Sequence, residues 1–168
     1  MTAVGGLHAS LCTQANGSGF ARLGVTTADP LPAWEQEVDR RRTAGWLPEN
    51  WIARRLSPRP AETMPGARAV LVLAMAASPW RSFAPGLAGF AAHYLHLDRA
   101  VAKADEVAMV LRENGWAAAV YPRDPRLPLK ALAERAGLGR YGRNGLLYLP
   151  GLGSFAVLVQ IVTDAPLP

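Results

Sequence analysis

The sequence predicts an α+β fold in which one mixed β-sheet has helices on both of its faces. Apolar runs of strand length alternate along the chain with segments whose apolar residues recur at helical spacing. The last two apolar runs, however, follow each other across a short Gly- and Pro-rich link, which breaks a regular series of parallel strands and helices. At 168 residues the chain is expected to form a single domain over residues 1–168.

The first part of the chain predicts two helices and two strands. Apolar residues at helical spacing mark a helix over residues 3–15, which ends at an Asn-Gly pair. A short strand over 20–25 precedes a charged helix over 32–43. The apolar run at 68–75 does not alternate with polar residues, so it should be a strand covered on both faces of the sheet.

The second part predicts a loop and then five elements. Two prolines and two aromatic residues favour a loop over 79–89. The elements that follow are a helix over 91–112, a strand over 116–121, a short helix over 129–136, and strands over 145–149 and 155–162. Because only five residues, Pro150 to Ser154, separate the last two strands, they are expected to pair as a hairpin.

Composition limits the classes of protein. The formal net charge is +5, which permits an anionic partner such as a phosphate-bearing cofactor, RNA or an acidic protein. The alternative is that the arginine- and alanine-rich composition reflects a GC-rich genome. A single cysteine, Cys12, cannot form an internal disulfide or hold a structural zinc or an iron–sulfur cluster. No signal-peptide pattern or membrane-length apolar run is present, so we expect a cytoplasmic protein with no membrane partner.

The segment 123–155 is the candidate functional region. Five arginines and one lysine fall within residues 123–143, mixed with glycines in the run GLGRYG. Such a turn can bind an anion through backbone N–H groups and guanidinium forks. Its order is helix, glycines, strand, which is opposite to that of a dinucleotide-binding loop. A helix cap followed by a turn is the alternative that the pattern leaves open.

Two residues are candidate proton donors. Asp124 lies between Arg123 and Arg126, and these cations should lower its pKa and keep it ionised. A turn-capping carboxylate is the alternative role for Asp124. Tyr94 is the second candidate, and a half-buried structural tyrosine is its alternative.

Other chemistry has little support in the sequence. His93, His96 and Asp98 form the only histidine cluster, but one evident carboxylate beside two histidines does not predict a metal site. Nucleophilic hydrolysis is unsupported because no Gly-x-Ser-x-Gly pattern is present.

The block LPLKALAERAGLGRYGRNGLLYLPGLGSF, with RPAETMPGARAVLVLAM upstream, resembles the corrinoid-binding half of the epoxyqueuosine reductase family. The resemblance covers about residue 20 to about 164, and AGLGRYGRN and GLGSF are its specific parts. It is closer to the uncharacterised reductase-like branch than to the tRNA-modifying enzymes. It implies a nitroreductase-like fold that holds a cobalamin, and an FMN-binding module on the same fold is the alternative.

The resemblance also implies roles for individual residues. An aspartate near the start of the block would donate a proton, and Asp124 is the nearest match. The residues expected to contact the cobalamin are Lys130, Gly139, Arg140, Tyr141, Gly142, Arg143, Asn144, Gly153, Ser154 and Phe155.

Partners follow from the same resemblance. In the family, a module with iron–sulfur clusters feeds electrons to cobalt. Since these residues contain one cysteine, that electron donor is expected in a separate or downstream module. The substrate side admits tRNA. The remaining alternative is a non-enzymatic domain that binds RNA or a protein through its basic face.

Overall fold

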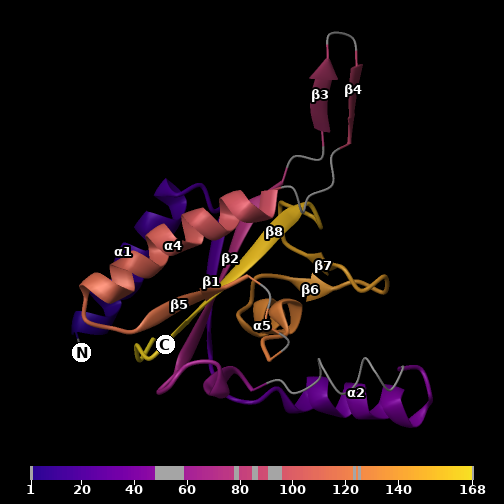
Figure 1. Ribbon diagram of the computed structural model, residues 1–168, viewed down its shortest axis with the longest axis horizontal. Helices are drawn as coiled ribbons and strands as arrows, with labels where there is room; N and C mark the ends of the chain where they lie inside the picture. The colour runs from indigo at the N-terminus through magenta and orange to yellow at the C-terminus, as the bar shows by residue number, and fades with distance from the viewer. Residues whose placement is uncertain are drawn as a thin grey trace.

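A four-stranded β-sheet forms the centre of the computed structural model, with helices on both of its faces (Figure 1). The strands are β1 (Arg22–Thr27), β2 (Ala69–Ala76), β5 (Ala118–Tyr121) and β8 (Ala156–Thr163). The structure describes residues 2–47, 59–77, 80–84, 87–90, 96–122, 124 and 126–167. The predicted α+β class is confirmed.

The sheet has the order β1-β2-β8-β5, and every neighbouring pair in it is antiparallel. The prediction of a mixed sheet is therefore wrong for the described strands. The reason is that β8 returns between β2 and β5 and runs opposite to both, with Ala69 opposite Thr163 and Ala76 opposite Ala156. The expectation of a doubly covered strand at 68–75 is confirmed, because every residue from Ala69 to Met75 is buried.

One face of the sheet packs against α1 (Thr2–Gly17) and α4 (Leu97–Glu113), as Figure 1 shows. The buried residues of α4 recur at three- and four-residue spacing, which places them on one side of the helix. They meet alternate side chains of β2 and β8, and the members of this cluster with no exposed surface include Leu11, Leu71, Leu73, Val107, Leu111, Val159 and Ile161. This face therefore carries a core independent of the candidate site.

The opposite face packs against the short helix α5 (Leu129–Arg135). Leu132 is fully buried and belongs to the same cluster as Val70 and Val72 of β2. The segment that follows α5 adds Leu138, Leu147 and Leu149 to that cluster. These leucines fix the backbone of the motif-bearing segment on the sheet. By contrast, α2 (Pro32–Thr43) buries only Val38 and lies away from the sheet (Figure 1).

Two small hairpins complete the described fold. Strands β3 (Trp80–Ala84) and β4 (Leu87–Phe90) pair and project from the body, so the loop predicted over 79–89 is wrong (Figure 1). Strands β6 (Arg140–Tyr141) and β7 (Leu147–Tyr148) form the second hairpin.

The hairpin predicted between 145–149 and 155–162 is also wrong, because β7 pairs with β6 while β8 pairs with β2 and β5. A 3-10 turn (Pro60–Glu62) precedes β2. Among the described helices, none is both long enough and apolar enough to cross a membrane.

Candidate functional site

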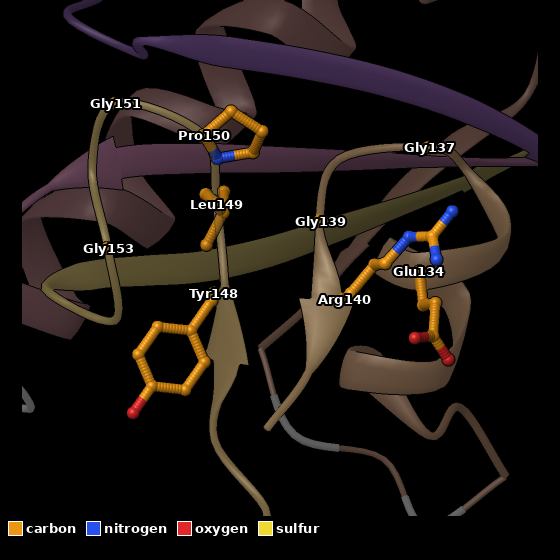
Figure 2. Close-up of a pocket in the computed structure, with 9 residues that line it drawn as sticks. All are labelled: Glu134, Gly137, Gly139, Arg140, Tyr148, Leu149, Pro150, Gly151 and Gly153. Carbon is orange, nitrogen blue, oxygen red and sulfur yellow. The ribbon is translucent and has the colours of Figure 1, made fainter.

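A cavity of about 860 Å³ lies between the end of α5, the β6–β7 hairpin and the loop after β7. Its volume falls within the range of small-molecule and cofactor pockets. Figure 2 shows the nine lining residues, which are Glu134, Gly137, Gly139, Arg140, Tyr148, Leu149, Pro150, Gly151 and Gly153. The cavity thus forms inside the segment that the sequence marks as functional.

The glycines of this segment have two different roles. A Cβ at Gly139 would overlap the carbonyl oxygen of Tyr148, so glycine there permits the close approach of β6 and β7. Gly137 and Gly153 have φ angles of +74° and +62°, and a Cβ at either position would meet no atom within 4 Å. Their backbone therefore faces open space and leaves room for a large ligand.

The loop after β7 forms a fixed wall of the cavity. The N–H of Leu149 donates a hydrogen bond to the carbonyl of Gly153, and the N–H of Gly153 donates one to the carbonyl of Leu149, both at 2.9 Å. Arg22 of β1 donates from Nη2 to the carbonyl of Pro150 at 2.6 Å. A strand distant in sequence therefore anchors the tip of this loop.

Two predicted cofactor ligands hold the β6–β7 turn together. Lys130 Nζ donates to the carbonyl of Gly145 at 2.7 Å. Asn144 Nδ2 donates to the Tyr148 hydroxyl at 3.0 Å, and Asn144 Oδ1 accepts from the N–H of Leu146. Both side chains stabilise the hairpin, and their contact with a cofactor stays a prediction.

Charged and aromatic side chains surround the cavity. Glu134 Oε1 accepts a hydrogen bond from the N–H of Tyr141 at 3.0 Å. Burial raises the pKa of Tyr141 to about 12, and the Glu134 charge adds to this shift, so the phenol keeps its proton at neutral pH. Tyr141, Leu146, Tyr148 and Phe155 all expose apolar surface beside this site.

Three of the ten predicted cofactor ligands line the cavity: Gly139, Arg140 and Gly153. Tyr141, Gly142, Arg143 and Asn144 belong to the adjoining hairpin and its turn. Ser154 and Phe155 follow the loop, and Phe155 is exposed. Their roles stay predictions.

Six lining residues are not among the predicted cofactor ligands, although one of them, Gly137, belongs to the GLGRYG run that the sequence singles out. Of the six, Glu134 and Tyr148 carry polar side chains. Glu134 looks like an ordinary polar position on a short helix. Only the return of the β6–β7 hairpin over the end of α5 brings its carboxylate to the cavity.

Asp124 does not line the cavity. Its carboxylate accepts hydrogen bonds from Arg126 Nη2 at 2.7 Å, Nε at 3.0 Å and the backbone N–H at 2.8 Å. The side chain of Asp124 is 12% exposed. These bonds hold the pKa of Asp124 below its usual value, which keeps the group ionised.

Other sequence candidates add no site. Tyr94 and His93 lie outside the described residues. His96 is buried at the start of α4. No group of three or more histidine, cysteine or acidic side chains that could hold a metal ion occurs in the part of the chain that the structure describes.

Comparison with known proteins confirms the resemblance seen in the sequence. No family model matches the chain. A curated epoxyqueuosine reductase from Staphylococcus aureus (strain NCTC 8325 / PS 47) is 27% identical over 162 residues, which cover 88% of this chain and 42% of that protein. The chain therefore spans less than half the length of this relative.

Solved structures share the fold. The crystal structure of a selenomethionine-labelled epoxyqueuosine reductase has a TM-score of 0.81 at 22% identity, over 98% of this chain and 47% of that one. An epoxyqueuosine reductase with an epoxyqueuosine-modified tRNA-Tyr stem loop has a TM-score of 0.80 at 23% identity, over the same shares.

A more distant likeness extends to another class of reductase. The reductive dehalogenase whose structure suggests a mechanism for B12-dependent dehalogenation has a TM-score of 0.58 at 21% identity, over 94% of this chain and 19% of that one. The α+β fold with its antiparallel sheet is thus shared with about half of each of these two epoxyqueuosine reductase chains.

Proposed function

We propose that this chain is the corrinoid-binding domain of an epoxyqueuosine reductase-like redox protein, on a nitroreductase-like fold. The observation that carries the proposal is the large cavity walled by glycines 137, 139, 151 and 153. It lies in the GLGRYGRN…GLGS segment, which is the specific part of the sequence resemblance. The sequence match to an epoxyqueuosine reductase and the fold shared with a B12-dependent dehalogenase support the same ligand class.

The residues present fit such a ligand. Gly137 and Gly153 leave open space for a broad ring, while Tyr148, Leu149 and Pro150, which lie between them in Figure 2, offer apolar contact. When bound, a corrinoid would supply a redox-active cobalt. The chain itself would bind and orient that group, and the electrons would come from an iron–sulfur donor, because one cysteine cannot ligate a cluster.

Asp124 is the proposed proton donor, with Tyr94 as the second candidate. In this structure the ion pair with Arg126 keeps the Asp124 carboxylate ionised and hydrogen-bonded. We therefore expect Asp124 to carry a proton only after its pair with Arg126 opens. Proton transfer would then be coupled to a rearrangement of the Asp124 and Arg126 side chains.

FMN is the alternative cofactor, and the charges at the cavity argue against it. The lining contains one guanidinium, that of Arg140, and one carboxylate, that of Glu134. A phosphate prefers a site with excess positive charge or several converging N–H groups. The balanced pair instead favours a ligand whose polar groups are mainly neutral.

RNA is a proposed second ligand, with tRNA as the substrate. The net charge of +5 favours a polyanion, and a reductase with the same fold has been solved with a tRNA stem loop. A basic domain that binds RNA without any cofactor is the competing proposal. Corrinoid titration separates the two.

The test is titration of the purified protein with cob(II)alamin, followed by visible and EPR spectroscopy. We expect saturable changes in both spectra. The Arg140→Glu variant should bind several-fold more weakly, whereas Arg99→Glu, the same charge change on the exposed face of α4, should bind like the wild type. Unchanged spectra at protein concentrations on the order of tens of micromolar would overturn the proposal. A yellow preparation that retains FMN would favour the alternative cofactor.

A further inference from the structure

Glu134 and Arg140 place opposite charges next to each other at the same cavity. The Glu134 carboxylate is held 3.0 Å from the nitrogen of the peptide that joins Arg140 to Tyr141. Figure 2 shows both side chains close together at one end of the group of lining residues, on the other side of Gly139 from Tyr148 and Leu149. Within the described residues Glu134 and Arg140 form no ion pair with each other, and the hydrogen bond from Tyr141 uses only Oε1 of Glu134, so Oε2 and the Arg140 guanidinium can contact a ligand.

The two groups have complementary hydrogen-bonding capacities. An ionised carboxylate only accepts hydrogen bonds, and a guanidinium only donates them. An acidic ligand group would pair with Arg140 but would be repelled by Glu134. A cationic group would pair with Glu134 but would be repelled by Arg140. A primary carboxamide carries an N–H₂ donor and a C=O acceptor on one planar group, so it satisfies both residues at once.

We propose that Glu134 and Arg140 select a ligand whose peripheral groups are neutral primary amides over the form in which those groups are carboxylic acids. This inference rests on the proposed corrinoid-binding function. Corrinoids occur with primary amides around the ring edge and, in precursor forms, with carboxylates at the same positions. The pair then makes the domain specific for fully amidated corrinoids. Glu134 is the residue that rejects the acid form.

The chain offers a conservative variant that isolates the charge of Glu134. In Glu134→Gln, the amide oxygen still accepts the hydrogen bond from the N–H of Tyr141, so the hairpin keeps its contact with α5. The variant loses the negative charge and gains an N–H₂ donor, which can serve a ligand carboxylate. Its effect on ligand preference therefore reports on recognition and not on the fold.

The test compares cobinamide, which carries ring amides, with cobyrinic acid, which carries carboxylates, by visible-spectrum titration. We expect the wild type to prefer cobinamide by about tenfold or more. Glu134→Gln should bring the two affinities within about threefold of each other. Arg140→Gln should shift the ratio in the other direction, because the acid form loses its only charged partner. Circular dichroism confirms that each variant is folded.

The possible outcomes distinguish a failure of the amide selectivity from a failure of the proposed corrinoid-binding function. A wild-type protein that binds neither corrinoid contradicts the proposed function itself. Binding of both with equal affinity contradicts the selectivity alone. A strong preference that Glu134→Gln leaves unchanged also contradicts it, because the discrimination then comes from elsewhere in the cavity.

Discussion

At the scale of single residues, Asp124 shows how one neighbour sets a protonation state. The pattern Arg-Asp-Pro-Arg predicts that cations lower the pKa of Asp124, and the structure identifies Arg126 as the main cause. All three recorded donors to the carboxylate come from that residue. Arg126 also donates to the carbonyl of Glu62, so the pair is tied to the turn before β2.

Replacing Arg126 should change stability in a pH-dependent way. The pKa of Asp124 is lowered on folding, so its contribution to stability is present above its ordinary value of 3.8 and is lost as pH falls through the folded-state value. We expect Arg126→Gln to lower the free energy of unfolding at neutral pH, because the ionised Asp124 carboxylate loses the side-chain donors of Arg126. The difference from the wild type should shrink below about pH 4. Urea unfolding at several pH values measures it.

An exposed ion pair provides the control for this experiment. Arg42 pairs with Asp39 on α2, where both side chains are exposed. Arg42→Gln should therefore change the free energy of unfolding by less than about 0.5 kcal/mol. A difference between wild type and Arg126→Gln that stays constant down to about pH 3 would show that Asp124 does not carry the effect.

Glycine illustrates where residue-level prediction ends. The sequence shows a run of glycines and predicts a site, and an open cavity does lie against that segment. Sequence alone does not distinguish Gly139, which lets two strands approach, from Gly153, which faces open space. That distinction depends on the position of Tyr148, nine residues further along the chain than Gly139. The role of each glycine is therefore set by the pairing of β6 with β7 and not by the sequence motif.

At the scale of elements, local signals predicted the helices well and the pairings poorly. The helix expected over 32–43 has those bounds in the structure, because its termini are set by a proline and by the break at Gly45. The strands expected at 68–75 and 155–162 are also present, shifted by one residue. Their partners were not predictable, since β8 pairs with two strands that lie far from it in sequence. The two-residue strands of the β6–β7 hairpin are too short to show any periodicity.

The anchor between β1 and the loop after β7 yields the prediction at this scale. Arg22 donates to the carbonyl of Pro150 and is the recorded side-chain contact that ties this loop to the sheet. We expect Arg22→Ala to speed hydrogen exchange at the amides of Leu152 and Gly153 by about fivefold, which corresponds to about 1 kcal/mol of local opening. Exchange measured by NMR or mass spectrometry reports this directly.

The same experiment should leave the rest of the molecule unchanged. Amides of the buried strand β2 should keep their protection, and the global free energy of unfolding should change by less than about 0.5 kcal/mol. Arg99→Ala, on the exposed side of α4, is the matched control and should alter neither region. Unaltered exchange at Gly153 in Arg22→Ala would show that the loop's own hydrogen bonds suffice to hold it.

At the scale of the whole molecule, two kinds of electrostatics coexist. The chain carries a net charge of +5, which acts at long range on a polyanion. The cavity instead places one carboxylate beside one guanidinium, so its local charges balance. The proposed RNA ligand would be attracted by the net positive charge, and the proposed corrinoid would be bound by the balanced charges of the cavity.

Salt should therefore separate the two ligands. Raising salt from about 50 mM to about 300 mM should weaken binding of a fluorescent tRNA stem loop by about tenfold or more, because phosphate contacts release counterions. Cobinamide affinity should change by less than about twofold, since balanced charges at short range are screened little. Fluorescence anisotropy and visible-spectrum titration measure the two in the same buffers. RNA binding that ignores salt would show that the basic surface does not drive it, and cobinamide binding that collapses with salt would contradict recognition by a balanced pair.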